Sequence, residues 1–331
     1  MPRQPQAPDA SQERWQYVFS GKSAVVIRGL NAEALHRSLA FTGGHAVPAA
    51  NSPKDPEIDV RFLPFGGEMQ NALAALAPGE RLTFQRPDGE LSYYSDGFIV
   101  FRGDKSTIDV YLAPAEQCSM TGALGQSIFR VVARAGGLVL HAGAFEIGGL
   151  AFLAIGDSGS GKSAIAAAVL SAAGRVISDD LVLVCGAIEP KESEPPTIHA
   201  SRPDAYFSID TRHLLPTSLS SKVHPYMKAG RTKLRLLRSA APQAFLSKTT
   251  PSCTVILSAE GRQKHTLCKL ASQGEAIAAM ISANGYLSQG VAPNADALIA
   301  TALHLTTSRP VMKLTVGTRL INDPRAELAD I

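Results

Sequence analysis

The sequence predicts an α/β C-terminal domain that carries a phosphate loop, preceded by a β-rich α+β N-terminal domain. Three observations lead to this fold class. Short strand patterns separated by turn residues fill residues 15–116, strands mix with helices over residues 117–331, and the segment GDSGSGKS joins an apolar run to an alanine-rich one at Gly156–Ser163. Residues 1–14, which are rich in Pro, Gln and Ala, predict a disordered tail.

The N-terminal domain is expected to hold strands, one helix and a meander. Its elements are a strand at Ser23–Leu30, a helix at Asn31–Ala40 capped by Asn31, a strand at Glu57–Phe65 and a meander at Glu80–Pro114 with turns at Asp88–Gly89, Asp96–Gly97 and Gly103–Asp104. These residues contain no chemical motif that we recognise, so substrate binding and regulation are both open as roles for this domain.

The C-terminal domain is expected to mix strands and helices around the phosphate loop. Before the loop come a helix over residues 117–136 and strands at Leu138–Ile147 and Leu150–Gly156. After it come a helix at Ser163–Ala173 ended by Gly174 at C′, strands at Arg175–Val184, Cys253–Ala259 and His265–Ala271, helices at Glu275–Tyr286 and Ala295–Thr306, and a strand at Val311–Gly317. Residues 191–197 read as a loop, and residues 198–250 follow no clear pattern.

Composition excludes several classes of function. The net charge of +3 is too small to indicate nucleic acid or an anionic membrane as a partner. No run approaches the ~20 apolar residues of a membrane span, and the first residues lack the apolar core of a secretion signal. The four cysteines are far apart, which is typical of reduced thiols in a cytoplasmic protein.

The pentapeptide SGKSA occurs twice, at Ser20–Ala24 and Ser160–Ala164, but only the second copy meets the requirements of a phosphate loop. Such a loop has the pattern GxxxxGK[ST], follows a strand and opens a helix. The first copy has Gln16 where the leading glycine should be and is followed by a strand pattern, so we interpret it as a turn at the entry to a strand.

In the second copy the residue types suit a triphosphate. The loop consists of Gly156, Asp157, Ser158, Gly159, Ser160, Gly161, Lys162 and Ser163, with Ala164 next. Glycines let backbone N–H groups converge on phosphate oxygens, the lysine binds the outer phosphates, and the serine hydroxyl binds Mg²⁺. The structural alternative, a Gly/Ser turn between strand and helix, does not explain why lysine and serine stand at the helix start.

Two further elements lie near the loop in the sequence. Asp179 and Asp180 come one helix after it, where one carboxylate can hold Mg²⁺ and the other accept a proton from an attacking hydroxyl. The alternative is an acidic strand end exposed to water, or an N-cap. His141 interrupts the apolar run LVLHAGAF before the loop; a lone histidine there is usually a core residue, but its neighbouring strand leads into the loop.

Together these elements resemble the catalytic domain of the HPr kinase/phosphorylase family, on Leu140–Gly143, Gly156–Ser163 and Ser178–Asp180. The resemblance implies an HPr-kinase-type phosphate loop and transfer of the γ-phosphate of ATP, with GTP as the alternative, to a seryl hydroxyl with Mg²⁺. It implies these roles: Lys162 as phosphate clamp, Ser163 and Asp179 as Mg²⁺ ligands, Asp180 as the base, His141 beside the carboxylates, and Arg231, in the basic segment Lys228–Arg238, as a phosphate contact. The same segment can equally be a solvated loop.

The sequence also departs from that family. Ala164 replaces an acidic residue, and Arg202–Asp210 lacks the Arg-Gly-rich signature of the reverse phosphorylase reaction. The layout is similar to that of diverged kinases in lasso-peptide clusters, which phosphorylate the C-terminal serine of a precursor peptide. A serine-bearing peptide or protein is therefore the expected partner, and the family suggests a homo-oligomer. An ATPase or nucleotide-binding regulator without an acceptor, an HPr(Ser) kinase and a small-molecule kinase are the alternatives.

Overall fold

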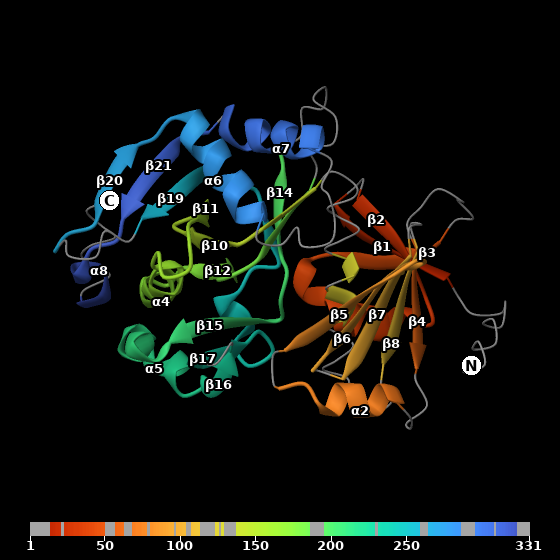
Figure 1. The fold of residues 1–331 in the computed structure, drawn as a ribbon. Helices are drawn as coiled ribbons and strands as arrows, with labels where there is room; N and C mark the ends of the chain where they lie inside the picture. The colour runs from red at the N-terminus through yellow and green to blue at the C-terminus, as the bar shows by residue number, and fades with distance from the viewer. Residues whose placement is uncertain are drawn as a thin grey trace. The chain divides into compact units, whose positions relative to one another are not determined.

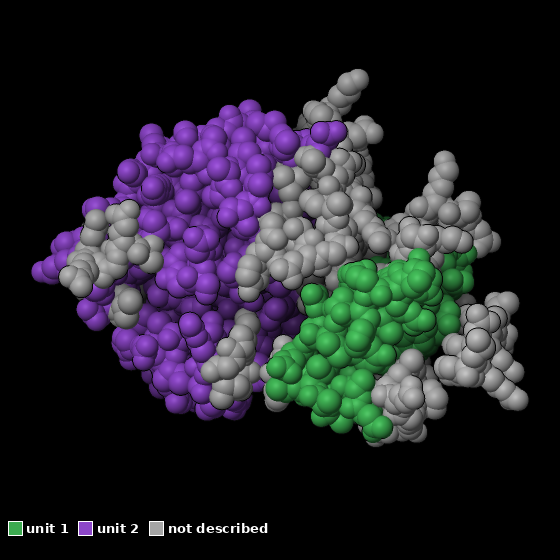
Figure 2. All heavy atoms as spheres, viewed as in Figure 1, with its two compact units in different colours: residues 1–18, 24–40, 44–128 green, residues 19–23, 41–43, 129–331 purple. Residues whose placement is uncertain are grey.

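The chain divides into two compact units in a computed structural model (Figure 2). Unit 1 comprises Met1–Val18, Ala24–Ala40 and Gly44–Ile128, and unit 2 comprises Phe19–Ser23, Phe41–Gly43 and Phe129–Ile331. The structure describes residues 14–20, 23–49, 57–62, 68–77, 80–95, 97–103, 107–112, 123–125, 127–128, 137–185, 195–228, 231–258, 264–285, 295–307 and 309–322. The expected boundary at residue 116 and most of the expected helix over 117–136 lie outside these residues.

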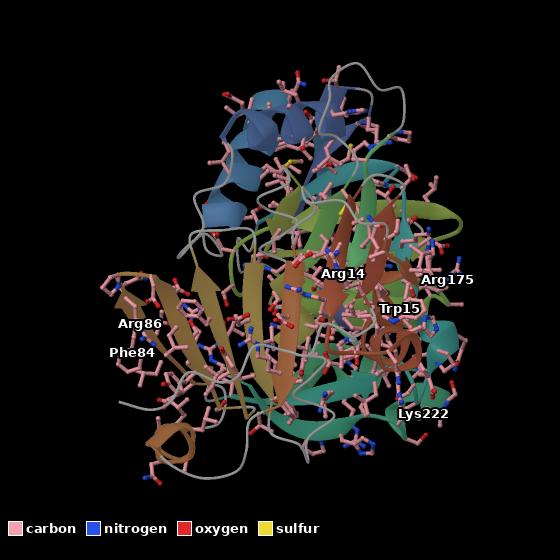
Figure 3. All side chains as sticks on the ribbon, turned by 90° about the vertical axis from the view of Figure 1, so that its right-hand side faces the viewer. Arg14, Trp15, Phe84, Arg86, Arg175 and Lys222 are labelled. Atoms are coloured by element: carbon pink, nitrogen blue, oxygen red, sulfur yellow. The ribbon has the colours of Figure 1, made fainter. Side chains whose placement is uncertain are left out.

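Unit 1 is built on one sheet of eight strands in the order β3-β1-β2-β4-β8-β7-β6-β5. The strands are β1 (Arg14–Ser20), β2 (Ser23–Arg28), β3 (His45–Pro48), β4 (Glu57–Phe62), β5 (Arg81–Arg86), β6 (Gly89–Tyr94), β7 (Phe98–Gly103) and β8 (Thr107–Leu112). The last four pair antiparallel in sequence order, which confirms the expected meander. The edge strand β5 carries exposed Phe84 and Arg86, which Figure 3 labels.

The elements at the start of unit 1 agree with the sequence in most respects. The helix α1 (Ala32–Leu39) is confirmed, and Asn31 caps it because its side chain accepts a hydrogen bond of 2.8 Å from Ala34 N. Around the first SGKSA copy, β1 ends at Ser20 and β2 begins at Ser23, so the expected strand follows it. Of the residues expected in the tail, Arg14 is the first residue of β1, and residues 1–13 lie outside the described part of the chain. A second helix, α2, spans Glu68–Ala74.

Unit 2 contains three sheets. The first has the order β12-β10-β11-β19-β21-β20, with β10 (Ala142–Ile147), β11 (Leu150–Ile155), β12 (Arg175–Ser178), β19 (Cys253–Ser258), β20 (Leu267–Leu270) and β21 (Val311–Thr315). The second has the order β18-β14-β13-β9, with β9 (Leu138–Leu140), β13 (Val182–Cys185), β14 (Thr197–Ala200) and β18 (Lys248–Thr249). The third has the order β15-β17-β16, with β15 (Asp204–Ser208), β16 (His224–Lys228) and β17 (Arg231–Leu237).

Helices and short turns complete unit 2. They are α4 (Lys162–Ser171), η2 (Ile209–Leu214), α5 (Thr217–Ser220), η3 (Pro242–Ala244), α6 (Gln273–Gly285), α7 (Ala295–Thr307) and α8 (Thr318–Asn322). The expected helices at Glu275–Tyr286 and Ala295–Thr306 are therefore confirmed as α6 and α7, apart from Tyr286, which lies outside the described residues. Among the helices that the structure describes, none is long and apolar enough to cross a membrane.

The helix α4 forms the centre of unit 2. Every residue from Ile165 to Leu170 is buried, because α4 contacts β10 and β12 on one side and β15 on another (Figure 1). Phe145, Phe207 and Leu257 belong to the same buried cluster. Small alanine side chains suit a helix that is covered all round, since neighbouring elements can then approach closely.

The end of α4 corrects the expected cap. Ala173, with φ 61°, occupies the left-handed C′ position, and Gly174 follows it. Gly174 N donates to Val169 O at 2.8 Å and Ala173 N to Leu170 O at 3.2 Å, which is the Schellman pattern. The glycine is needed for close packing instead: a Cβ at Gly174 would lie 2.5 Å from Glu146 O.

Two expected strands are each interrupted. Residues 138–147 form β9 and β10 with His141 between them, and residues 175–185 form β12 and β13 with Asp179–Leu181 between them. The strands change sheets at these points, which alternation of apolar residues alone does not reveal. The edge strand β12 is tied to β10 by Arg175 Nε, which donates to Glu146 Oε2 at 2.7 Å; Arg175 is labelled in Figure 3.

Residues 198–250, which had no clear pattern, hold β14 to β18 with η2, α5 and η3. Their strands are short, and in β17 half-buried Lys233 and Arg235 alternate with buried Leu234 and Leu236. Thr197, expected in a loop, is the first residue of β14. Pro195 and Pro196 lie in no helix or strand, as expected, and residues 191–194 of that loop lie outside the described part of the chain.

Candidate active site

The two strand interruptions lie side by side. β9 pairs with β13 through Leu140 and Val182, and β10 pairs with β12 through Ala144 and Ser178. His141, between β9 and β10, therefore lies opposite the bend Asp179–Leu181 between β12 and β13. The pairing explains how the histidine and the two aspartates, which come from two separate motifs, meet where the two sheets diverge.

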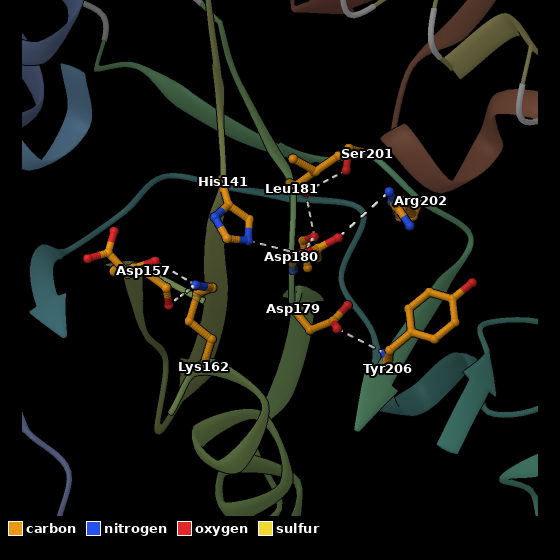
Figure 4. Close-up of polar contacts among 11 residues, drawn as sticks. His141, Asp157, Lys162, Asp179, Asp180, Leu181, Ser201, Arg202 and Tyr206 are labelled. Carbon is orange, nitrogen blue, oxygen red and sulfur yellow. Dashed lines mark hydrogen bonds and ion pairs between the residues drawn. The ribbon is translucent and has the colours of Figure 1, made fainter. Parts of the chain in front are cut away.

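Serine side chains shape the bend that carries the two aspartates. Ser178 Oγ and Ser201 Oγ both donate to Leu181 O at 2.5 Å, and Asp180 N lies 3.5 Å from Ser178 Oγ. A serine that bonds the backbone two or three residues on is a common turn-forming device. As a result Asp179 and Asp180 point to different partners (Figure 4).

Asp180 lies between a histidine and an arginine. His141 Nε2 is 3.2 Å from Asp180 Oδ1, and an Arg202 guanidinium nitrogen is 3.7 Å from Oδ2 (Figure 4). Burial by itself would lower the pKa of Arg202, but the carboxylates of Asp180 and Asp204 outweigh it and raise that pKa. The Asp180 side chain keeps 23% of its surface exposed, so it can meet a bound molecule.

Asp179 is held more tightly. Only 3% of the residue is exposed, and its Oδ2 accepts a hydrogen bond of 3.0 Å from Tyr206 N. The Tyr206 hydroxyl donates in turn to Asp204 Oδ2 at 2.9 Å, and burial is the main reason why the pKa of this tyrosine is raised. Asp179 is thus oriented by the backbone of β15 and differs from Asp180 in accessibility.

The glycine-rich segment lies between β11 and α4, in the strand–loop–helix context that the sequence predicted. Gly159 and Gly161 have φ angles of 89° and 101°, which favour glycine. Asp157, Ser158 and Gly159 are exposed, while the buried Ser160 Oγ has no hydrogen-bond partner among the residues that the structure describes. Ser163 and Ala164 follow in the first turn of α4, and both are partly buried.

Lys162 folds back over this loop. Its Nζ donates to Gly156 O at 2.5 Å and to Asp157 O at 2.9 Å, and only 7% of the residue is exposed (Figure 4). Burial lowers the pKa of Lys162, an effect that the negative charges of Asp180, Asp157 and Asp179 oppose. The lysine and both aspartates of the bend therefore share one electrostatic environment.

Arg231, the expected phosphate contact, is exposed at the start of β17 and pairs with Lys228 in the hairpin. Two residues along the same face, Lys233 is close enough to Lys162 to lower the pKa of its ammonium. Within this segment it is therefore the charge of Lys233, and not that of the expected Arg231, that acts on Lys162.

Arg238 binds backbone carbonyl groups on both sides of the bend Asp179–Leu181. Its guanidinium donates to the carbonyl oxygens of Arg202 at 3.2 Å, of Leu246 at 3.0 Å and of Ile177, and it stacks on the Phe245 ring at 4.6 Å. Burial lowers its pKa to about 10. Because Ile177 precedes the bend and Arg202 pairs with Asp180, this arginine fixes both sides of the carboxylate pair.

The sequence assigned no individual role to four residues of this site: Arg202, Tyr206, Lys233 and Arg238. All come from the segment without a clear pattern, and Tyr206 contributes its backbone N–H, which carries no sequence signal. Lys233 and Arg238 belong to the basic segment Lys228–Arg238, but the resemblance gave a role there to Arg231 alone.

Comparisons with known proteins add little. No protein-family model matches the chain, and no curated protein matches it. Among solved structures, the HPr(Ser) kinase/phosphatase from Coxiella burnetii aligns with 58% of this chain and 94% of its own, with 10% identity and a TM-score of 0.31. So loose a likeness of fold carries no argument, and a function for this chain has to rest on the residues of its own site.

Proposed function

We propose that this protein is a kinase that transfers the γ-phosphate of ATP to a seryl hydroxyl of a peptide or protein. The observation that carries the proposal is the position of Lys162, at the start of α4, near enough to Asp180 and Asp179 for their negative charges to act on the pKa of its ammonium (Figure 4). Phosphoryl transfer needs a positive clamp on the phosphates, a carboxylate for the metal ion and a base for the acceptor, and this group offers all three.

The loop residues Gly156–Gly161 and the first turn of α4 would hold the triphosphate. Their backbone N–H groups and the positive end of the helix dipole favour anions, and the exposed segment Asp157–Gly159 leaves the loop accessible. Lys162 would exchange its contacts with two carbonyl oxygens for the outer phosphates. Phosphate favours the charged ammonium, so binding opposes the effect of burial on the pKa of Lys162.

Ser163 and Asp179 would hold Mg²⁺ together with phosphate oxygens. When bound, this ion neutralises charge that develops on the β- and γ-phosphates. The donor set suits it, because Mg²⁺ prefers hydroxyl and carboxylate oxygens and is usually held by one or two protein ligands. The described residues include no cluster of three or more His, Cys, Asp and Glu side chains for a metal ion. Phosphate oxygens and water would complete the coordination beside Ser163 and Asp179.

Asp180 would act as the base. It is more exposed than Asp179, and His141 and Arg202 fix its two oxygens. Its carboxylate would accept the acceptor proton while the seryl oxygen bonds to the γ-phosphorus and the bond to the β-phosphate oxygen breaks, releasing ADP. His141 is a positioning residue, because its Nε2 lies 3.2 Å from Asp180 Oδ1 and holds that oxygen in place.

The test is a transfer assay with γ-labelled ATP and Mg²⁺, with GTP run in parallel. The acceptors are HPr and a panel of peptides with internal or C-terminal serine, the latter representing lasso-type precursors. Asp180→Asn should lower kcat by about 10²–10⁴-fold and leave nucleotide affinity within a few-fold. Asp210→Asn, which changes an exposed aspartate of η2, is the matched control and should behave as the wild type.

Two results would overturn the proposal. One is release of free phosphate at the same rate with and without every acceptor, which would indicate an ATPase or nucleotide sensor. The other is full transfer by the Asp180→Asn variant, which would remove the base from the mechanism.

A further inference from the structure

A cavity of about 480 Å³ adjoins the loop within unit 2. Its floor is formed by the carboxyl ends of β11 and β19, including Leu257, and one wall by the loop start at Asp157. The opposite wall is α6, which presents Ala279, Ser282 and Ala283. His141 completes the lining. A volume of this size lies within the ~300–1,000 Å³ typical of ligand pockets.

The lining is nearly uncharged. Its titratable members are His141 and Asp157, and the lining residues described include neither lysine nor arginine. A polyanion would therefore find no counter-charge in this space, whereas Lys162 and the helix start offer one beside it. The cavity suits an uncharged group with small apolar and hydroxyl contacts.

The position of Lys162 indicates which end of a triphosphate would face the cavity. Lysines of such loops reach the outer phosphates. Lys162 Nζ already lies against the carbonyl oxygens of Gly156 and Asp157, the same residues that line the cavity. His141, in the cavity wall, also contacts Asp180, the proposed base.

We infer that this cavity is the acceptor site, and that it takes an uncharged segment of the substrate around the reacting hydroxyl. The inference rests on the proposed function. Gly156 and Asp157, whose carbonyl oxygens Lys162 contacts, line the cavity, and so does His141, which contacts Asp180. An alcohol bound there would therefore lie near both the γ-phosphate and the base. The small side chains of α6 leave room for the serine residue and an uncharged neighbour, while the nucleoside extends away from this side.

The test uses substitutions on α6 that place larger side chains in the cavity. Ala279→Leu narrows it, and Ala278→Leu, the same change on the neighbouring exposed position, is the control. Ser282→Leu is a second filling variant at an exposed position and guards against misfolding of the first. Binding of Mg²⁺·ATP and of Mg²⁺·tripolyphosphate is measured for each variant, together with kcat/KM for the serine peptide that the wild type phosphorylates.

Ala279→Leu and Ser282→Leu should keep the affinities for Mg²⁺·ATP and Mg²⁺·tripolyphosphate within about twofold of the wild type. They should lower kcat/KM for the peptide at least tenfold, mainly by raising KM. Ala278→Leu should change neither the affinities nor kcat/KM. Weaker binding of ATP with unchanged binding of tripolyphosphate would overturn the inference, because the cavity would then hold the nucleoside. Unchanged peptide transfer would also overturn it. A wild type that binds no nucleotide would instead refute the proposed function, and this is seen before any variant is made.

Discussion

A buried histidine should make the stability of unit 2 depend on pH. His199, on β14, is fully buried, and its Nδ1 lies 2.8 Å from the carbonyl oxygen of Thr42, which belongs to the same unit. Burial lowers its pKa from 6.5 to about 4. The folded protein therefore resists protonation of this ring, whereas the unfolded chain accepts the proton freely.

The sign and size of the effect follow from the two pKa values. Above pH 6.5 the ring is neutral in both states and contributes nothing. Between pH 6.5 and about 4 only the unfolded chain gains the proton, so the free energy of unfolding falls as the pH falls. At ~1.36 kcal/mol per pKa unit the total loss is about 3 kcal/mol, reached near pH 4.

The assay is urea unfolding of the wild type, His199→Asn and a control, at pH values from about 7 to about 4. Asparagine keeps a donor near the Nδ1 position but does not titrate. The control is His224→Asn, which changes an exposed histidine of β16. If the two units unfold separately, the transition of unit 2 is the one compared.

Other groups also titrate in this range, so the informative quantity is the gap between wild type and variant, that is, the difference between their free energies of unfolding at each pH. His199→Asn should be less stable at neutral pH, and the gap should narrow by about 3 kcal/mol on acidification. A gap that stays constant with pH would refute the reasoning, because it would mean that burial does not perturb this ring. The control should keep a constant gap.

Three further predictions concern the loop, the end of α4 and the support of the carboxylates. Lys162→Met should weaken ATP binding at least tenfold, ~1.4 kcal/mol, whereas Lys22→Met in the first SGKSA copy should leave it unchanged; isothermal titration compares the two. Ala173→Gly should raise the free energy of unfolding by up to about 1 kcal/mol, because φ is 61° there. Gly174→Ala should lower it by ~1–3 kcal/mol, because a Cβ would meet Glu146 O at 2.5 Å. If both variants shift the midpoint of thermal unfolding equally, this cap geometry is contradicted. Arg238→Met should lower the free energy of unfolding by about 3 kcal/mol, since three backbone carbonyls lose a charged donor. It should also reduce phosphoryl transfer with little change in ATP affinity. A stable variant with normal transfer would show that the bend does not depend on Arg238.

The sequence predicted well wherever the signal is local. The loop Gly156–Ser163 lies between a strand and a helix as expected, because glycine spacing and apolar flanks specify that context within a few residues. The Asn31 cap and the meander of unit 1 were predictable for the same reason, since a capping side chain and turn residues act on their immediate neighbours.

The length of α4 was also predictable, but its cap was not. Gly174 is the residue that local rules place at C′, yet the left-handed conformation falls on Ala173. The glycine is needed one position later because the chain passes within contact distance of Glu146 O, and that approach depends on how β10 packs. Tertiary packing therefore overrode a local preference.

The sequence by itself determined that a glycine-rich loop between a strand and a helix, two adjacent aspartates and a histidine stand in one part of the chain. Only the tertiary structure decided how they meet. Two neighbouring strands are interrupted at adjacent positions, which brings His141 Nε2 to 3.2 Å from Asp180 Oδ1. Arg202, Tyr206 and Arg238 reach the bend from more than twenty residues further along the chain. Such pairings depend on which strands become neighbours, and that is fixed by the burial of whole sheets and of α4, not by any short run of residues.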